Sequence, residues 1–284
     1  MAEPKKYATA MDFRRALETR LGSIAERDNF TIERLRREVS FDRLLARLFA
    51  SDKAPWVLKG GYALELRMKE ARVTKDIDLV LRETLGKGET LHEALYAALK
   101  AAAAVDLGDF FVFVVGPVMM DLEAGGARFP IEARMADRTF MEFHIDIGAG
   151  DVLMAPLDVI EGHDWLKFAG IAAPRVPTIS REQHFAEKLH AYTVPRKTPN
   201  TRVRDLVDMD LLIKTGALDK PRVAEAIKIT FERRKTPVPS ALEAPPPAWE
   251  EPFAKLARQS GLSEEIGKSF SVLVDFFEGI QTDG

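Results

Sequence analysis

The sequence predicts an α+β protein, in which a small mixed β-sheet is flanked by helices and followed by a mainly helical C-terminal region. Three patterns indicate this class. Residues 30–50 carry apolar side chains at helical spacing, residues 73–81 and 139–148 alternate apolar and polar side chains, and helical spacing returns in the second half. We expect two domains: a sheet core with N-terminal helices over residues 1–160, and a mainly helical domain over residues 161–284.

Two helices are expected before the sheet. Residues 11–26 and 30–50 both show helical spacing of apolar side chains. In the second helix the apolar stripe falls at i, i+3, i+4 and i+7, and it consists of Phe41, Leu44, Leu45 and Leu48. We expect both helices to pack behind the sheet.

The segment from residue 57 to residue 82 carries the strongest chemical pattern in the chain. A short apolar strand at residues 56–58 leads into Gly60 and Gly61, and a helix is expected over residues 62–69. A helix N-terminus presents unpaired backbone N–H groups, and glycine lets a phosphate approach them closely. Taken alone, a Gly-Gly pair is also an ordinary turn.

An acidic strand is expected next, at residues 73–81. Period-two alternation places Asp76 and Asp78 on one face, while Ile77 and its apolar neighbours take the other face. The two carboxylates then lie about 6–7 Å apart and repel each other unless a cation lies beside them. Mg²⁺, which takes one or two carboxylates together with phosphate oxygens, suits this arrangement. A solvated strand face is the alternative interpretation.

A helix at residues 89–104 and three further strands are expected to complete the core. The strands are expected at residues 109–116, 128–136 and 139–148. A polar turn at Asp137–Arg138 joins the last two strands, and alternation places Asp146 on the polar face of the last one. Asp146 is therefore a candidate site residue, although a solvated strand face explains it equally well.

The second half of the chain opens with a helix-start signal. Ser180 and Gln183 form a capping box, in which the Ser180 hydroxyl accepts the Gln183 N–H and the Gln183 side chain reaches back. The helix is expected to continue to about residue 194, with Lys188 at the edge of its apolar stripe. A lysine in such a position commonly lays its stem on apolar surface and keeps its ammonium group in water.

Another helix is expected at residues 203–214, and it is apolar nearly all round. It nevertheless carries three carboxylates, Asp205, Asp208 and Asp210. Because buried carboxylates need partners, some of the three must meet a metal, a basic side chain or solvent in a cleft. The candidates for a purely structural ion pair are Arg202, Arg204 and Lys188.

Composition excludes several classes of protein. The chain of 284 residues is 46% hydrophobic, which suffices for a sizeable core, and it has no Cys, which excludes disulfides and Cys-based zinc sites. No apolar run approaches the roughly 20 residues of a membrane span, so we expect a cytoplasmic protein. Basic residues gather at residues 165–235, where they could face RNA if the charge segregation also forms a patch in space.

Four motifs follow one another along the chain. They are Leu58-Lys-Gly-Gly61, Thr74-Lys-Asp-Ile-Asp78, Ala186-Glu-Lys-Leu-His-Ala191 and Arg204-Asp-Leu-Val-Asp208. Together they resemble the AbiEii/AbiGii toxin family of nucleotidyltransferases, within the DNA-polymerase-beta-type nucleotidyltransferase superfamily. The resemblance covers roughly residues 40–215. The chain departs from it at Tyr62, where many members carry a small polar residue after the glycines.

The resemblance implies a role for each motif. The implied triphosphate-binding residues are Lys59, Gly60 and Gly61, and the implied metal ligands are Asp76, Asp78 and, as the third carboxylate that this fold uses, Asp146. Lys188 would contact nucleotide phosphate as a catalytic residue beside Asp76 and Asp78. Asp205 or Asp208 would supply the last acidic group.

The function implied is that of a toxin in a toxin–antitoxin system. Such an enzyme would use Mg²⁺, or alternatively Mn²⁺, to transfer nucleotides from an NTP to RNA, with the tRNA 3′ end as the expected acceptor and blocked translation as the result. Its partners would be the NTP, tRNA and a cognate antitoxin, without a membrane. Two alternatives are a nucleotidyltransferase that modifies a small molecule or protein, and a non-catalytic module that binds a nucleotide or a partner.

Overall fold

A computed structural model describes residues 6–68, 71–83, 89–122, 126–150, 152–195 and 202–282. The chain forms two compact units. The first, called the sheet unit, comprises Met1–Leu66, Val73–Asp151 and Val159–Thr178. The second, called the helical unit, comprises Arg67–Arg72, Val152–Asp158 and Ile179–Gly284. A division into domains at residue 160 stays a prediction from the sequence.

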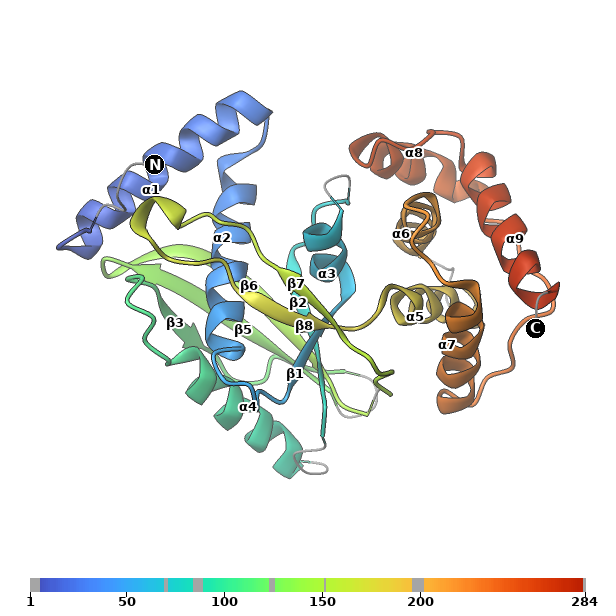
Figure 1. The fold of residues 1–284 in the computed structure, drawn as a ribbon, viewed down its shortest axis with the longest axis horizontal. Helices are drawn as coiled ribbons and strands as arrows, with labels where there is room; N and C mark the ends of the chain where they lie inside the picture. Colours follow the sequence, from blue (N-terminus) through green and yellow to red (C-terminus); the bar gives the residue numbers. More distant parts are fainter. Residues whose placement is uncertain are drawn as a thin grey trace. The chain divides into compact units, whose positions relative to one another are not determined.

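The sheet unit is built on a mixed sheet, to which the described residues contribute eight strands (Figure 1). The strands are β1 Trp56–Lys59, β2 Asp76–Leu81, β3 Val112–Val115, β4 Met120–Asp121, β5 Ala127–Met135, β6 Arg138–Gly148, β7 Asp158–Glu161 and β8 Arg175–Thr178. Their order is β3-β5-β6-β2-β1-β8-β7, with β4 paired to β5. Since β2 runs antiparallel to β1 and parallel to β6, the predicted α+β class with a mixed sheet is confirmed.

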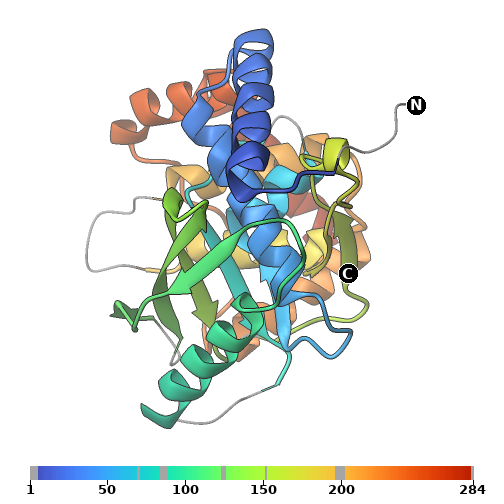
Figure 2. The same cartoon turned by 90° about the vertical axis from the view of Figure 1, so that its left-hand side faces the viewer.

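Helices cover one face of this sheet. The helices of the sheet unit are α1 Ala10–Asp28, α2 Ile32–Leu48, α3 Gly60–Arg67 and α4 Glu89–Ala103. α2 packs on β6, and α4 packs against α2 and β3 (Figure 2). The ring of Phe41 on α2 lies 4.9 Å from the ring of Tyr62 and 4.8 Å from that of Phe143 on β6. The predicted stripe of α2 therefore packs behind the sheet, as expected.

The two faces of the central strands differ in burial. Ile77 and Leu79 of β2 and Ile145 of β6 are 0% exposed and lie in the core beneath the helices. Asp76, Asp78 and Asp146 alternate with these apolar residues and are partly exposed on the opposite face. The predicted alternation of both strands is confirmed.

Several element boundaries differ from the sequence prediction. α3 already begins at Gly60, and β2 begins at Asp76 rather than at residue 73. The turn of the β5–β6 hairpin consists of Ala136 and Asp137, one residue earlier than predicted. Both residues have positive φ angles, 53° and 57°, as the type I′ turn of a two-residue hairpin requires. The polar residues Asp137 and Arg138 suggested a turn at that position. The twist of paired strands favours a two-residue turn with positive φ angles, and Ala136 and Asp137 have these angles.

The helical unit contains five α-helices among the described residues. They are α5 Arg181–Thr193, α6 Val203–Lys214, α7 Lys220–Arg233, α8 Glu250–Gln259 and α9 Ile266–Thr282. α5 packs against α6 and α7, and α6 packs against α9. No helix in the described part of the chain has the length and apolar character that crossing a membrane requires.

The start of α5 confirms half of the predicted capping box. The Ser180 hydroxyl accepts the Gln183 N–H at 3.1 Å, as predicted. The Gln183 side chain does not reach back to Ser180, and this part of the prediction is wrong. Instead its Oε1 accepts the Met154 N–H at 3.0 Å, and its Nε2 donates to the Val152 carbonyl at 2.7 Å. Gln183 thus fastens residues 152–158 to α5, a contact between segments that local sequence cannot show.

One buried ion network holds α2 in the sheet unit. Asp109, which is 0% exposed, accepts a hydrogen bond from Arg43 Nε at 2.6 Å and from Arg47 Nη2 at 2.6 Å. Burial alone would raise the pKa of Asp109, but the two guanidinium groups outweigh burial and lower the pKa below its usual value. The carboxylate is therefore held in its charged form between two buried cations.

We predict that Asp109→Ala destabilises the protein by about 3–5 kcal/mol, because it leaves two buried arginines without a counter-charge. Chemical denaturation followed by circular dichroism measures the change. Asp28→Ala is the matched control, since Asp28 also pairs through both oxygens with an arginine, Arg27, but on the exposed surface. This control should leave stability nearly unchanged. Equal effects of the two substitutions would contradict the prediction.

Candidate functional site

The Gly-Gly turn joins β1 directly to the N-terminus of α3. Gly60 has a φ angle of +67°, a conformation that residues with a Cβ rarely adopt. A Cβ on Gly60 would also collide with the carboxylate of Asp78, and a Cβ on Gly61 would lie 2.7 Å from the Thr74 hydroxyl. Both glycines are thus required by the close approach of the acidic segment. The turn presents helix N-terminal amides beside that segment, where an anion is favoured.

Three aspartates and one arginine share the open face of the sheet, and we call them the carboxylate face: Asp76, Asp78, Asp146 and Arg128. Asp78 of β2 is the register partner of Asp146 of β6, which in turn lies opposite Arg128 of β5. Arg128 donates two hydrogen bonds to Asp146, from Nε and Nη2, each at 2.7 Å. Thr74 donates its hydroxyl proton to Asp76 at 3.0 Å. The structure therefore brings the three predicted aspartates to one face.

The carboxylate face fits a divalent cation in part. Asp76 and Asp78 are partly exposed, and Mg²⁺ takes one or two carboxylates together with phosphate oxygens. Within the described residues, however, no three acidic or His side chains converge as a metal-binding group. The hydrogen bond that Arg128 donates to Asp146 and the charges of all three aspartates raise the pKa of Arg128. Asp146 is thus engaged by Arg128, and its role as a third metal ligand stays a prediction.

Tyr62, the residue at which the chain departs from the family motif, has a structural role. Its side chain is 0% exposed, and its hydroxyl donates to Asp42 Oδ1 at 2.6 Å. Burial, followed by the charge of Asp42, raises the pKa of Tyr62 well above its usual value. The hydroxyl therefore lies in the core beneath α2 and contributes nothing to a phosphate site.

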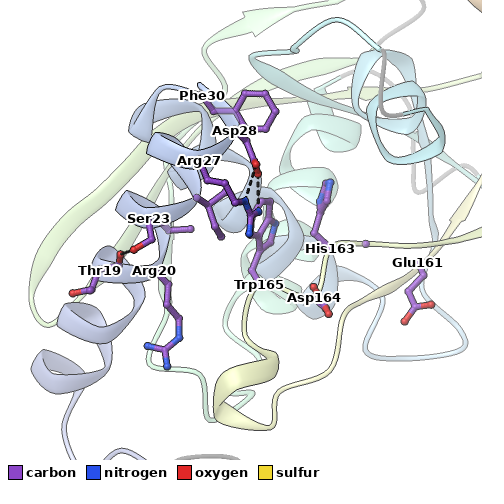
Figure 3. A pocket seen from close by; sticks show the side chains of 13 residues that line it. Thr19, Arg20, Ser23, Arg27, Asp28, Phe30, Glu161, His163, Asp164 and Trp165 are labelled. Carbon is purple, nitrogen blue, oxygen red and sulfur yellow. Dashed lines mark hydrogen bonds and ion pairs between the residues drawn. The ribbon is translucent and has the colours of Figure 1, made fainter. Parts of the chain in front are cut away.

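A cavity of about 1080 Å³ lies elsewhere in the sheet unit, between α1 and residues 161–165 (Figure 3). Its arginines already have partners. Arg27 forms a bidentate ion pair with Asp28, and the Arg20 guanidinium stacks on the Phe168 ring at 3.9 Å. None of its lining residues belongs to β1, β2 or β6. Despite its size, this cavity is not the place of the predicted chemistry.

The helical unit gathers the other predicted residues into a buried ion cluster, which we call the Lys188 cluster: Arg72, Lys188, Asp205 and Asp208. Lys188 Nζ lies 2.6 Å from Asp208 Oδ2 and 3.2 Å from Asp205 Oδ1. Arg72 donates to both oxygens of Asp208, at 3.0 and 2.9 Å. Burial alone would lower the pKa of Lys188, but Asp208 and Asp205 outweigh burial and raise it. Two cations and two anions thus neutralise one another.

Asp210 is separate from this cluster. It is 0% exposed, pairs with Lys214 at 2.9 Å and accepts a hydrogen bond from the Ser269 hydroxyl. These contacts explain a buried carboxylate on α6 without any ligand. Among the three aspartates of the helix, Asp205 and Asp208 remain the candidates for a functional role.

Sequence reasoning missed Arg72 and Arg128. Each is a single arginine outside the four motifs, and each pairs with an aspartate that is remote in sequence. Arg128 could have been found from the strand register, because it lies opposite Asp146 once the hairpin turn is placed correctly. Arg72 carries no comparable signal.

Two buried carboxyl groups, Glu38 on α2 and Glu65 on α3, interact near the Gly-Gly turn. Glu65 on α3 is 7% exposed, and its Oε2 accepts the Thr74 N–H at 3.1 Å. Burial, followed by the charge of Glu38, raises the pKa of Glu65 to about 8. Glu38 itself is held by Arg34 at 2.6 Å. Glu65 thus connects α3 to the start of the acidic segment and prefers its protonated form in the folded protein.

We predict that Glu65→Gln stabilises the protein by an amount that grows as the pH rises from 4.5 to about 8. The pKa of Glu65 is higher in the folded than in the unfolded chain, so its contribution to stability is fully present below pH 4.5 and is lost as the pH rises through about 8. The neutral glutamine avoids this loss and can still accept the Thr74 N–H. Thermal melts between pH 4.5 and 9 measure the difference. Glu33→Gln, at an exposed position of α2, is the control, and a pH-independent difference for Glu65→Gln would contradict the prediction.

We also predict that Asp208→Ala destabilises the protein by about 3–5 kcal/mol, because it leaves excess positive charge buried in the Lys188 cluster. The double substitution Lys188→Met with Asp208→Leu removes one charge of each sign, and Arg72 and Asp205 remain. It should therefore recover most of the lost stability. Denaturant titration measures both. A double variant as unstable as Asp208→Ala would show that the net charge of the cluster is not what matters.

Comparison with known proteins identifies a family and similar solved structures. The family model for the nucleotidyl transferase AbiEii toxin of type IV toxin–antitoxin systems matches residues 43–275. Among solved structures, MenT4, a nucleotidyltransferase toxin from Mycobacterium tuberculosis H37Rv, is 17% identical and covers 95% of this chain and 97% of its own, with a TM-score of 0.56. JHP933 from Helicobacter pylori is 15% identical and covers 89% of this chain and 94% of its own, with a TM-score of 0.49.

No curated protein sequence matches the chain. At its level of identity, the likeness to MenT4 establishes the fold alone. The family match, in contrast, spans most of the chain and includes all four sequence motifs. The chain belongs to the AbiEii family of nucleotidyl transferase toxins of type IV toxin–antitoxin systems.

Proposed function

We propose that this toxin uses Mg²⁺ to transfer a nucleotide from an NTP to an RNA acceptor, with the 3′ end of tRNA as the acceptor. The observation that carries the proposal is the close approach of the Gly60 backbone to the Asp78 carboxylate. It places backbone N–H groups, which favour phosphate, beside carboxylates, which favour a cation. A nucleoside triphosphate with its metal needs both.

The sheet unit would bind the triphosphate and its metal. Lys59 and the backbone of Gly60 and Gly61 would hold the phosphates, and Asp76 and Asp78 would hold the cation. When bound, Mg²⁺ neutralises charge on the phosphates and on the attacking and leaving oxygens. Asp76 and Asp78 fix its position, and a carboxylate that is not fully committed to the cation accepts the proton of the acceptor hydroxyl.

The reaction is an in-line displacement. The acceptor hydroxyl oxygen forms a bond to the α-phosphorus, the bond from that phosphorus to the bridging oxygen of the β-phosphate breaks, and pyrophosphate leaves with the electron pair. The role of the chain is to position the reactants and to neutralise charge. Transfer to the tRNA 3′ end would prevent aminoacylation and block translation in the cytoplasm, and a cognate antitoxin would relieve the block.

The Lys188 cluster has two possible roles. In the catalytic one, Lys188 contacts nucleotide phosphate, and Asp205 or Asp208 supplies an acidic group. In the structural one, the four charges only stabilise the helical unit. The ion pairs of the cluster are consistent with both. The double variant Lys188→Met with Asp208→Leu distinguishes them, because a purely structural cluster would keep activity once stability is recovered.

We predict that the purified protein incorporates label from at least one NTP into total tRNA in the presence of Mg²⁺. Asp78→Ala should lower the rate by at least about a hundredfold, because it removes a ligand of the catalytic cation. Asp121→Ala, an exposed aspartate on β4 of the same sheet, is the control and should remain active. Gel electrophoresis of the labelled RNA measures incorporation.

The outcome also decides between acceptor classes. Label found in a small molecule or in protein, with none in RNA, would replace tRNA by another acceptor. Equal incorporation by wild type and Asp78→Ala would remove the assignment of the carboxylate face. If no nucleotide is transferred to any acceptor, the non-catalytic alternative gains support.

A further inference from the structure

A second cavity, about 640 Å³ in volume, lies in the sheet unit between the N-terminal part of α2, Lys75 and the strands β5 and β6, and we call it the edge pocket. It lies where β2 begins. β6 pairs with β2 only from His144 onward, where His144 is the register partner of Asp76. Residues 138–143 of β6 extend beyond this point, and the structure pairs them with β5 alone. The residues of the pocket used below are Arg37, Lys75, Pro130, Met141, Phe143 and His144.

The edge pocket contains a buried arginine whose hydrogen bonds are incomplete. Arg37 of α2 is 8% exposed, and its Nε has no hydrogen-bond partner among the described residues. Its ion pair is with Glu33, at 3.9 Å, and the Glu33 side chain is 74% exposed. A buried donor without an acceptor is unfavourable, because it has lost its hydrogen bond to water without gaining another. By contrast, Arg47 on the same helix donates to a carboxylate and to two carbonyl groups. Arg37 Nε thus lacks an acceptor of the kind that Arg47 has.

The charged side chains that line the pocket are two cations, Arg37 and Lys75, and three carboxylates, Glu33, Glu132 and Glu142. Lys75 is exposed, directly precedes Asp76 and makes no ion pair within the described residues. Of the acidic lining residues, Glu132 is engaged by Arg134 at 3.1 Å and by the Thr139 hydroxyl at 2.5 Å. Glu33 and Glu142 are exposed to solvent, which screens them. The buried guanidinium and the lysine are therefore the groups that a ligand would meet.

Part of the wall of the edge pocket is apolar. Pro130 and Met141 are partly exposed, and Phe143 is buried. Apolar walls with a few converging polar groups are typical of small-molecule sites, whose volumes are about 300–1,000 Å³. The size of the pocket fits one nucleotide. A flat base would suit the apolar side chains, and a single phosphate would suit Arg37 and Lys75.

The sheet order distinguishes this site from the triphosphate site. β2 lies between β1 and β6, so the Gly-Gly turn is on one side of the acidic strand and the edge pocket is on the other. In-line transfer needs the acceptor and the leaving group on opposite sides of the reacting phosphorus. With the triphosphate at the turn, the edge pocket is on the side from which an acceptor would approach.

We propose that the edge pocket binds the terminal nucleotide of the RNA acceptor, with a phosphate on Arg37 and Lys75 and the base against the apolar wall. This inference rests on the proposed function, because it assigns the acceptor of the same reaction. It adds two positioning residues, Arg37 and Lys75, and a place for the base to the residues of the four motifs.

The test uses the full-length protein and a single-stranded RNA oligonucleotide with a free 3′ hydroxyl and a 3′-terminal 4-thiouridine. Fluorescence anisotropy without NTP gives RNA affinity, and irradiation followed by mass spectrometry locates the crosslinked peptide. Arg37→Gln and Lys75→Ala should each weaken RNA binding about tenfold, the equivalent of one charge-assisted hydrogen bond. The crosslink should fall between Pro130 and His144. In transfer assays the KM for RNA should rise, and the KM for NTP should change less than twofold.

The control is Arg27→Ala, which lies in the cavity of Figure 3 and outside the edge pocket. This variant should bind RNA as wild type does. Since Lys75 is exposed, Lys75→Ala carries the test even if Arg37→Gln folds poorly. Wild-type affinity of Lys75→Ala, a crosslink elsewhere, or a rise in the KM for NTP alone would overturn the proposal, and so would failure of wild type to bind the oligonucleotide.

Binding and crosslinking need no nucleotide transfer, so they separate this proposal from the proposed function. If RNA binds and crosslinks in the edge pocket but no nucleotide is transferred, the proposed binding site is supported and the proposed reaction is contradicted. If nucleotides are transferred to RNA while both pocket variants keep the wild-type KM for RNA, the proposed reaction is supported and the role of the edge pocket is contradicted.

Discussion

The contact between the backbone of Gly60 and the carboxylate of Asp78 constrains much of the sheet unit. It requires β1 and β2 to be antiparallel neighbours with Lys59 opposite Asp78, and it requires α3 to begin without an intervening loop. Because neither glycine has a side chain, the helix N-terminus and the acidic strand can approach this closely, and the antiparallel pairing of β1 with β2 holds them there. The geometry of the carboxylate face depends on this contact, because β2 pairs with β6 in the register that places Asp78 beside Asp146.

Each unit holds a buried carboxylate between two cationic side chains. The sheet unit surrounds Asp109 with two arginines, and the helical unit surrounds Asp208 with Lys188 and Arg72. Each carboxylate keeps a lowered pKa although burial opposes it. The buried ion pair that the sequence left open for Lys188 is therefore present. A structural cluster and a catalytic cluster would show the same ion pairs in the absence of substrate. Measurements of activity distinguish the two.

Periodicity and motif order predicted the central strands, the Gly-Gly turn and the helices of both halves, because these depend on residues close in sequence. The short strands β4, β7 and β8 were not predicted, since two to four residues give too little alternation to detect. The partners of Gln183 and Arg72 could not be predicted either, because each pairs with a segment that only the tertiary fold brings near. The shared face of Asp76, Asp78 and Asp146 was predicted, but the arginines that pair with the site aspartates, Arg72 and Arg128, were not.

The two-residue turn between β5 and β6 has an electrostatic consequence at the far end of its hairpin. The turn fixes the register that places Arg128 opposite Asp146, so the local geometry at Ala136 and Asp137 determines how much negative charge the open face of the sheet carries. Through this register the hairpin brings one guanidinium group to a face that carries three carboxylates, and so reduces the negative charge of that face.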